Sequence, residues 1–400
     1  MDRWILVLIS ILVFTVSALL SAIDFYQPDT RVEGPSNQML ERLNAIGYLP
    51  YIPGEVPEDK KGVVYYDRSK AYDGVNIYTP QNMGVVYLMG MDGRILHTWK
   101  VPVEYASREL YAEMGGDGSI YILSRDKILK LDWDSRLQWI NRGSYHHDLT
   151  LLPDGRVYAL SSRGINITRL DTVFSLQDNL IVVLDANGRR VKELSLHDVV
   201  GDFLDRRLSK IKRKQERGNA EEESYLGLFH ANTINLLHND ISVARSGDVI
   251  VCARNINLIF ILNVERGELV WSWWDNGLKL PHYPTVLDNG NILVFDNMGN
   301  EGFSRVVEYD PLQKRFVWEY EGHPPELFYS DTRGGSQRLP NGNTLITETN
   351  RGRIFEVTRD GEIVWDFWVP DVNSKNNRAV VSRMKRLDWV VVEKLLAENR

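Results

Sequence analysis

The chain has 400 residues, of which 43% are hydrophobic and 25% are charged, with 30 Gly and 15 Pro. This composition excludes a disordered chain, a collagen and a membrane protein with many spans, so we expect a globular body with a large core. The formal net charge of -7 offers no cationic surface to neutralise phosphates, so we expect no nucleic-acid partner. The single cysteine, Cys252, excludes an internal disulfide and any zinc or iron–sulfur site built from several cysteines.

The amino terminus contains an uncharged run from Trp4 to Ile23, about the length that crosses a hydrocarbon core of roughly 30 Å. Arg3 precedes this run and Asp24 follows it, so the positive-inside rule predicts a cytoplasmic amino end and an exported body. We expect residues 1–23 to form a retained signal anchor, with the body on the periplasmic or extracellular side and residues 24–61 as a linker. A cleaved signal peptide and a buried core helix are the alternatives.

The body then repeats one pattern, in which two alternating apolar stretches flank a short turn of the Asp-Gly or Asn-Gly type. Such pairs predict β-hairpins. One set of turns precedes a strand that ends in Trp or another bulky residue, and its members are Asp92-Gly93, Asp132–Ser135, Asn187-Gly188, Arg266-Gly267, Pro311–Gln313 and Asp360-Gly361. A second set alternates with it and consists of Asp73-Gly74, Asp117-Gly118, Asp154-Gly155, Gly247-Asp248, Asn289-Gly290 and Asn341-Gly342.

Two hairpins per unit predict a four-stranded sheet, and six units at a spacing of roughly 50 residues are typical of a propeller. We therefore expect an all-β fold, a six-bladed β-propeller over residues 62–370. Its last unit, ending near Trp368, should close the ring against the amino-terminal hairpin. A solenoid with polar caps is the alternative.

Two segments depart from the repeat. Residues from about 199 to 228 are helical in pattern and heavily charged, which predicts a helical insertion that is either a solvated surface element or a cover over a binding site. Residues 371–400 should form a C-terminal helical tail on the propeller rim, because apolar residues recur at helical spacing: Val381, Met384, Leu387, Val391 and Leu395.

Three of the eight histidines share a register within the repeat. His147 lies seven residues before Asp154, His282 lies seven before Asn289, and His230 opens the corresponding strand of the intervening unit. Equivalent positions on consecutive blades point to equivalent places, and the innermost strands of a propeller line its central channel. We therefore expect the three imidazoles to converge near the axis.

Arg254 ends the strand that follows His230, and Asn232 lies on the same strand face as His230. Together with the three imidazoles, this guanidinium and this amide would form an anion site. The alternatives are that each histidine satisfies structural hydrogen bonds, or that the three ligate zinc, against which the charge of Arg254 counts. Phosphate-binding glycine loops are absent from the sequence, and we expect no metal and no cofactor.

At this point the residues resemble a known family, the PAPS-independent arylsulfate sulfotransferases. The resemblance covers roughly Gly62 to Pro370. It is strongest in His146–Thr150, Phe229–Thr233 with Arg254, Pro281–Pro284, Asn289–Asn297, Ser304–Glu308 and Gln337–Ile346.

The resemblance implies a ping-pong reaction in which a sulfuryl group passes from an aryl sulfate to a channel histidine and then to a phenolic acceptor. His282 is then the nucleophile. His230, Arg254 and one of His146 or His147 would hold the sulfuryl oxygens with help from Asn232; the register favours His147, and His146 would contact substrate. A neutral imidazole can attack, and a protonated neighbour could serve as general acid for the departing phenolate.

Other functions stay open. A membrane-tethered propeller of this kind could bind an anionic ligand or a protein partner without turnover. A quinone-dependent dehydrogenase is also built from Trp-ended blades, although such enzymes resemble larger rings with a metal site. A homodimer is a further open alternative.

Overall fold

The structure is a computed structural model that describes residues 51–52, 59–106, 110–124, 126–216, 227–274 and 277–399, all within one compact unit, Asn44–Arg400. The expected anchor, residues 1–23, and most of the expected linker lie outside the described residues. Among the helices that are described, none is long and apolar enough to cross a membrane.

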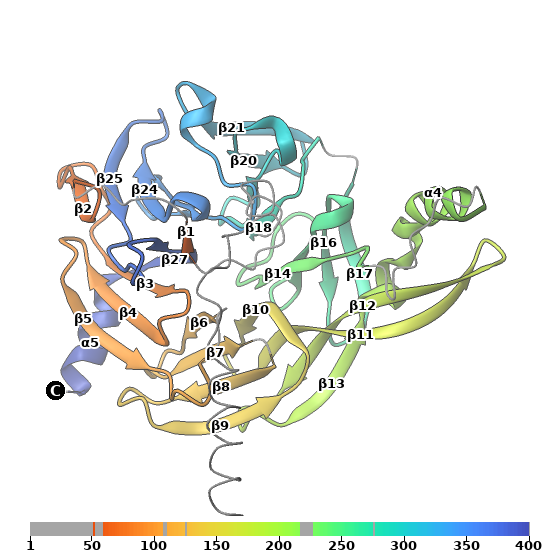
Figure 1. Cartoon of the computed structure of the whole chain (residues 1–400), viewed down its shortest axis with the longest axis horizontal. Coiled ribbons are helices and arrows are strands. Elements are labelled where there is room, and N and C mark those ends of the chain that lie inside the picture. Colours follow the sequence, from red (N-terminus) through yellow and green to blue (C-terminus); the bar gives the residue numbers. More distant parts are fainter. Residues whose placement is uncertain are drawn as a thin grey trace, which may run out of the picture. The chain divides into compact units, whose positions relative to one another are not determined.

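All but two of the described strands form six antiparallel sheets arranged around an axis, which is a six-bladed β-propeller (Figure 1). Five of these sheets have four strands and one has five. Three blades, each written from its inner to its outer strand, are β6 (Leu110–Met114), β7 (Ile120–Ser124), β8 (Lys127–Leu131), β9 (Leu137–Arg142); β10 (Tyr145–Leu151), β11 (Val157–Arg169), β12 (Thr172–Leu184), β13 (Arg190–Ser195); and β14 (Ala231–Leu236), β15 (Val249–Ala253), β16 (Leu258–Asn263), β17 (Glu268–Trp273).

The remaining blades complete the ring. They consist of β18 (His282–Val286), β19 (Ile292–Asp296), β20 (Arg305–Asp310), β21 (Arg315–Glu321); β22 (Gly335–Arg338), β23 (Thr344–Glu348), β24 (Arg353–Val357), β25 (Ile363–Trp368), β2 (Gly62–Tyr66); and β27 (Val381–Leu387), β3 (Val75–Pro80), β4 (Val85–Gly90), β5 (Ile95–Lys100). A further pair joins β1 (Tyr51–Ile52) to β26 (Arg378–Ala379).

The predicted turns carry the backbone geometry that hairpins require. Gly290, for example, joins β18 to β19 with φ 84°, a conformation that favours glycine. One predicted hairpin is wrong, because Asp73-Gly74 does not join two paired strands. β2 before it lies in one blade and β3 after it lies in the next, so the turn crosses between blades.

The ring closes in a way that corrects the expected helical tail. Val381–Leu387 is the strand β27, which pairs with β3 as the innermost strand of a blade. Val381 and Met384 are buried in the same apolar cluster although they lie three residues apart, because the pairing register shifts between them, and this irregularity imitates helical spacing. A helix, α5 (Trp389–Glu398), begins only after Asp388, whose side chain caps it by accepting from Val390 N. β2 belongs to another blade, where it pairs with β25 and forms the outer edge of the sheet.

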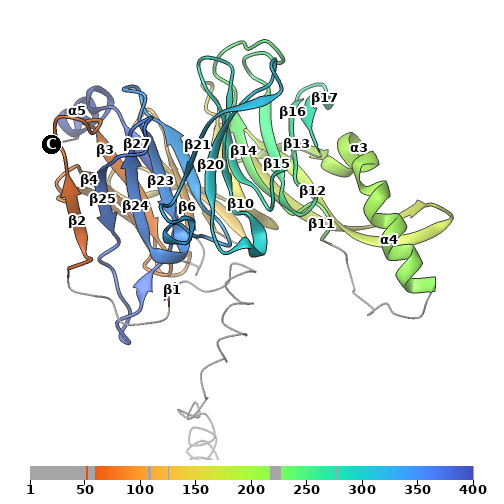
Figure 2. The ribbon, with the colours of Figure 1, turned by 90° about the horizontal axis from the view of Figure 1, so that it is seen from above.

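The expected insertion is helical up to residue 216, as α3 (Leu196–Val200), η1 (Gly201–Leu204) and α4 (Asp205–Glu216), whereas residues 227–228 at its end are not helical. It lies along the hairpin β11–β12, which extends beyond the other strands of its blade (Figure 2). Leu204 and Leu208 are buried in the same apolar cluster as Phe174 of this hairpin. Short 3-10 turns occur at η2 (Arg254–Ile256), η3 (Gly299–Glu301), η4 (Pro325–Leu327) and η5 (Thr349–Arg351).

Apolar side chains of neighbouring blades pack into a chain of buried clusters between the sheets. One cluster, for example, joins Ile259 and Ile261 of β16 to Val294 of β19 and Val307 of β20. This packing leaves the polar ends of the inner strands to face the axis, where the candidate site lies.

Candidate active site

A cavity of about 620 Å³ lies where the inner strands meet. His147, His230 and His282 all line it, so the convergence that their shared register predicted is present in the structure. The other residues predicted for the site, His146, Asn232 and Arg254, also line this cavity. Their roles in a reaction remain predictions.

The inner strands are irregular where they carry these side chains. The pairing register shifts between Tyr145 and Leu149, between Ala231 and Thr233, and between His282 and Thr285. His147 (φ 61°) and Tyr283 (φ 48°) lie within these shifts and have positive φ although they are not glycine, and His230, directly before β14, also has positive φ (49°). Such conformations cost roughly 1–3 kcal/mol each, and bulges of this kind are common where a strand must aim a side chain into a site.

Three imidazoles are joined directly to one another. Nδ1 of His146 lies 2.8 Å from Nδ1 of His147, and Nε2 of His147 lies 3.1 Å from Nε2 of His230. The ring centroids are 5.0 Å and 4.7 Å apart, with the planes nearly perpendicular. Each contact is a hydrogen bond between one protonated and one unprotonated ring nitrogen.

His282 is held by acceptors on one of its two nitrogens. Its Nδ1 lies 2.5 Å from Oδ1 of Asn297 and 3.1 Å from the carbonyl oxygen of Leu280. Asn297 cannot present its amide nitrogen instead, because that nitrogen donates to the carbonyls of Ser330 at 2.6 Å and Arg333 at 2.9 Å. Nδ1 therefore carries the hydrogen, and the lone pair of the neutral ring is on Nε2.

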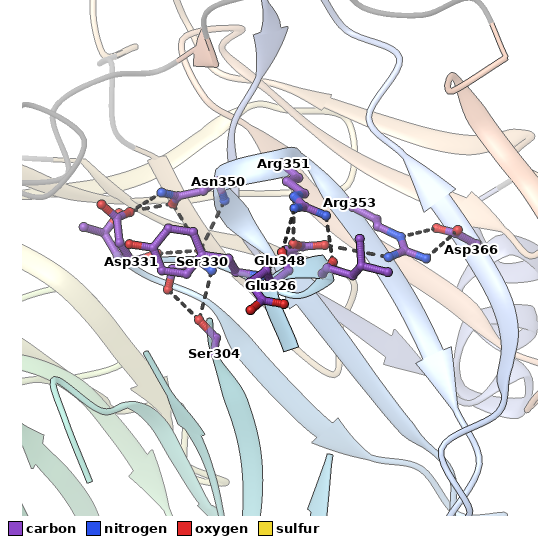
Figure 3. A network of polar contacts seen from close by, with 12 residues as sticks. Ser304, Glu326, Ser330, Asp331, Glu348, Asn350, Arg351, Arg353 and Asp366 are labelled. Atoms are coloured by element: carbon purple, nitrogen blue, oxygen red, sulfur yellow. Dashed lines mark hydrogen bonds and ion pairs between the residues drawn. The ribbon is translucent and has the colours of Figure 1, made fainter. Parts of the chain in front are cut away.

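The loop that contains Ser330 and Arg333 accepts hydrogen bonds from Asn297. A polar network fixes this loop in turn (Figure 3). Ser330 N donates to Oγ of Ser304 at 2.9 Å, and Oγ of Ser330 accepts from Asn350 N at 3.2 Å. Asn350 also donates to Asp331.

The same network continues to a buried carboxylate. Glu348 accepts from Tyr329 N at 2.9 Å and pairs with Arg351 at 3.3 Å and Arg353 at 3.9 Å. Burial raises the pKa of Glu348 to about 7 against the pull of the two arginines. These contacts hold the Ser330 carbonyl in place, and through Asn297 they fix the orientation of the His282 ring.

Burial lowers the pKa of every imidazole in the cavity. The pKa falls to about 4 for His146 and to about 3 for His230 and His282, where the positive charge of Arg254 adds to the effect of burial. The pKa of His147 also falls well below its usual value, through burial and then the neighbouring His230. The His147 ring is exposed to the cavity, so solvent there limits this shift. All four rings are therefore neutral at pH 7, as a nucleophilic imidazole must be.

One of these neutral rings can act as a general acid only after it takes up a proton. The expected protonated neighbour, His230 or His147, is neutral on its own at pH 7. A bound anion within hydrogen-bonding distance favours the protonated form of an imidazole and would raise its pKa.

Arg254 and Asn232 connect the blades at this point. Arg254 begins η2, its backbone N–H donates to the carbonyl of His230 at 3.2 Å, and its guanidinium donates to Oδ1 of Asn255 at 3.1 Å. Burial lowers the pKa of Arg254, but an arginine stays charged. Asn232 donates to the carbonyl of Pro281 at 2.9 Å and so ties β14 to the residue before His282.

A further charged group, besides Arg254, Arg333 and Asp126, lines the cavity and comes from a segment that the sequence analysis misassigned. Arg383 of β27 lies between the rings of Tyr111 and Tyr283, 3.9 Å from each centroid, and pairs with the buried Asp148 at 2.7 Å. The sequence offered no signal for Arg383, because its segment resembled a helix. Asn297 stood within a motif of the family resemblance, but nothing in the sequence indicated its contact with His282.

Two further histidines, His97 and His197, lie outside the cavity. His97 is stacked on Trp133, and His197 pairs with Asp198 at 3.6 Å. None of the described residues of the helical insertion lines the cavity, so these residues give no support to the alternative that the insertion covers the binding site. In the part of the chain that the structure describes, no group of three or more His, Cys, Asp or Glu side chains is arranged to hold a metal ion.

Comparison with known proteins gives a family and a fold. A family model described as Arylsulfotransferase (ASST) matches residues 119–369. No curated protein matches the chain. A solved protein of unknown function from Bacteroides caccae is 14% identical with a TM-score of 0.50, covering 79% of this chain and 99% of its own.

Two lyases are also similar. A streptogramin B lyase is 13% identical with a TM-score of 0.48, covering 83% of this chain and 96% of its own. Virginiamycin B lyase from Staphylococcus aureus is 13% identical with a TM-score of 0.43, covering 78% and 89%. At 14% identity, the likeness to the Bacteroides caccae protein concerns the fold alone.

Proposed function

The chain belongs to the arylsulfotransferase family, and from this premise we propose that it moves a sulfuryl group from an aryl sulfate to a phenolic acceptor through His282. The observation that carries the proposal is the state of the His282 ring. The ring is neutral, and its Nδ1 donates a hydrogen bond to Asn297, so its lone pair is on Nε2. The ring and Arg254 line the same cavity.

In the first half-reaction, the Nε2 lone pair of His282 attacks the sulfur atom of the donor. The bond between sulfur and the aryl oxygen breaks, and its electron pair leaves with the phenolate. The ring becomes positively charged as the N–S bond forms, and the Nδ1 hydrogen bond to Asn297 strengthens with that charge. Arg254 balances the negative charge of the sulfuryl oxygens throughout.

In the second half-reaction, the oxygen of an acceptor phenol attacks the same sulfur atom and loses its proton. The N–S bond breaks, and its electron pair returns to Nε2 of His282. The reaction therefore needs no metal and no nucleotide, only a place for one proton between its two halves.

The main rival is a propeller that binds an anionic ligand or a protein partner without turnover, because the same cationic cavity would hold a sulfate ester. Covalent labelling distinguishes the two. The protein is incubated with 4-nitrophenyl [35S]sulfate, quenched in base and digested, and the label is mapped. We expect an acid-labile, base-stable label on His282 that chases into added phenol, and no label in His282→Ala.

His97→Gln is the matched control, since His97 lies outside the cavity and the variant should be labelled normally. A folded wild-type protein that binds the ester but never becomes labelled would refute sulfuryl transfer and support the rival.

We also propose that residues 1–23 anchor the chain and that the propeller is exported. Fractionation of cells that express the full chain tests this. Recovery of the protein in the cytosol would contradict the proposal.

A further inference from the structure

The imidazoles of His146, His147 and His230 form an unbroken chain, with nitrogen–nitrogen distances of 2.8 Å and 3.1 Å. A contact of this kind holds one hydrogen, donated by one ring and accepted by the next. Three neutral rings carry three hydrogens. Two of these occupy the contacts, so one remains for only one of the two ends of the chain.

The two ends are Nε2 of His146 and Nδ1 of His230. A fourth proton can therefore be added at the unprotonated end without breaking either contact. The added charge is then shared by three rings, because hydrogen-bonded groups polarise one another. An isolated imidazole in this cavity would have to hold the whole charge alone.

We propose that His146, His147 and His230 act as a proton relay, which takes up one proton as the aryl sulfate binds, donates it to the departing phenolate and recovers it from the acceptor phenol. This inference rests on the proposed sulfuryl transfer and assigns a role to His146, which faces the chain and not His282.

The steps balance over one turnover. When the sulfur–oxygen bond of the donor breaks, the hydrogen on Nδ1 of His230 moves to the phenolate oxygen, and the chain returns to three hydrogens. When the acceptor attacks sulfohistidine, its phenolic proton moves to Nδ1 of His230. The chain then again holds four hydrogens, and no oxidant, metal or further co-reactant is required.

The charges around the chain explain why the extra proton arrives with the substrate. His230 faces Arg254, and His147 faces His282 and Arg333. These groups oppose a proton on the chain. Arg383 also lines the cavity, but Asp148 neutralises it. The sulfate anion supplies the opposite charge and favours the protonated chain.

The test compares donors whose leaving groups need the proton to different extents. Phenyl sulfate releases a strongly basic phenolate, whereas 4-nitrophenyl sulfate releases a weakly basic one. The glutamine side chain of His146→Gln can occupy the same space as the imidazole but cannot take up an additional proton. We expect His146→Gln to slow kcat/KM for phenyl sulfate by about 100-fold and for 4-nitrophenyl sulfate by less than about threefold. His97→Gln should leave both rates unchanged.

A second measurement needs no turnover, and the wild-type protein alone can decide it. Inorganic sulfate is added to the wild-type protein in weakly buffered solution near neutral pH, and proton uptake is recorded. We expect about one proton per protein at saturation. Where His146→Gln folds, it should take up clearly less.

The outcomes separate the two proposals. Equal slowing of both donors by His146→Gln, or no proton uptake by the wild type, would overturn the relay and leave sulfuryl transfer intact. If neither donor labels His282 in the wild type, sulfuryl transfer fails and the relay fails with it. If His146→Gln does not fold, proton uptake by the wild type decides.

Discussion

Asn297 is the residue whose removal tests the geometry of the site most directly. It is fully buried, and its side chain makes three hydrogen bonds, to His282 Nδ1 and to the carbonyls of Ser330 and Arg333. In Asn297→Ala, the partly buried Arg333 carbonyl loses this partner, whereas Nδ1 of His282 keeps the carbonyl of Leu280 and the Ser330 carbonyl keeps Oγ of Ser304. Because a polar group that loses its partner on burial costs roughly 1–3 kcal/mol, and two of the three groups keep a partner, we expect the free energy of unfolding to fall by about 1–3 kcal/mol.

The same substitution should reduce the rate. Without Oδ1 of Asn297, only the carbonyl of Leu280 still favours a hydrogen on Nδ1 of His282, and the ring can turn. We expect kcat/KM for 4-nitrophenyl sulfate to fall by about 100-fold, which corresponds to about 2.7 kcal/mol of transition-state stabilisation.

Asn343→Ala is the matched control for this experiment. Asn343 is also buried, and its amide donates to the carbonyl of Lys70 at 2.9 Å and to Glu356 at 2.6 Å, away from the cavity. It should lose stability to a similar extent in a urea titration while keeping its kcat/KM at a temperature where both variants are folded. If the two variants lost activity equally, the orienting role of Asn297 would be refuted.

Three further predictions concern charge. Arg254→Ala should lower kcat/KM for aryl sulfates by about 100- to 1,000-fold and Arg254→Lys by less, measured by release of 4-nitrophenol; an equal loss in both would contradict a role for charge. Arg383→Met should destabilise the protein by about 3–5 kcal/mol in urea, since it leaves the buried Asp148 unpaired, and the second change Asp148→Asn should restore part of this loss. The pKa of His282 is lowered to about 3, so we expect kcat/KM for 4-nitrophenyl sulfate to stay constant as the pH is lowered through 6.5, where an ordinary histidine takes up a proton. A fall in kcat/KM near pH 6.5 in the folded protein would show that the His282 ring becomes charged there.

Much of the fold was readable from the sequence, because hairpin turns and strand alternation are local signals. Turn residues such as Asn289-Gly290 mark where a strand must reverse, and six repeats of paired hairpins cannot bury their apolar faces except against one another. The register of His147 and His282 relative to such turns placed both on inner strands. Their convergence followed from the ring, without knowledge of any contact.

The tertiary structure alone decided how the ring closes and what surrounds the histidines. Val381–Leu387 has helical spacing in the sequence, and it is a strand because β3, about 300 residues earlier, pairs with it across a register shift. That pairing brings Arg383 into the cavity, a consequence of a non-local contact that no local pattern records. The hydrogen on His282 Nδ1, the lowered pKa values and the contacts from His146 to His230 likewise depend on burial and on neighbours from other blades. Residue types and spacing determined which side chains meet at the axis, whereas their protonation and orientation depend on distances that exist only in the folded ring.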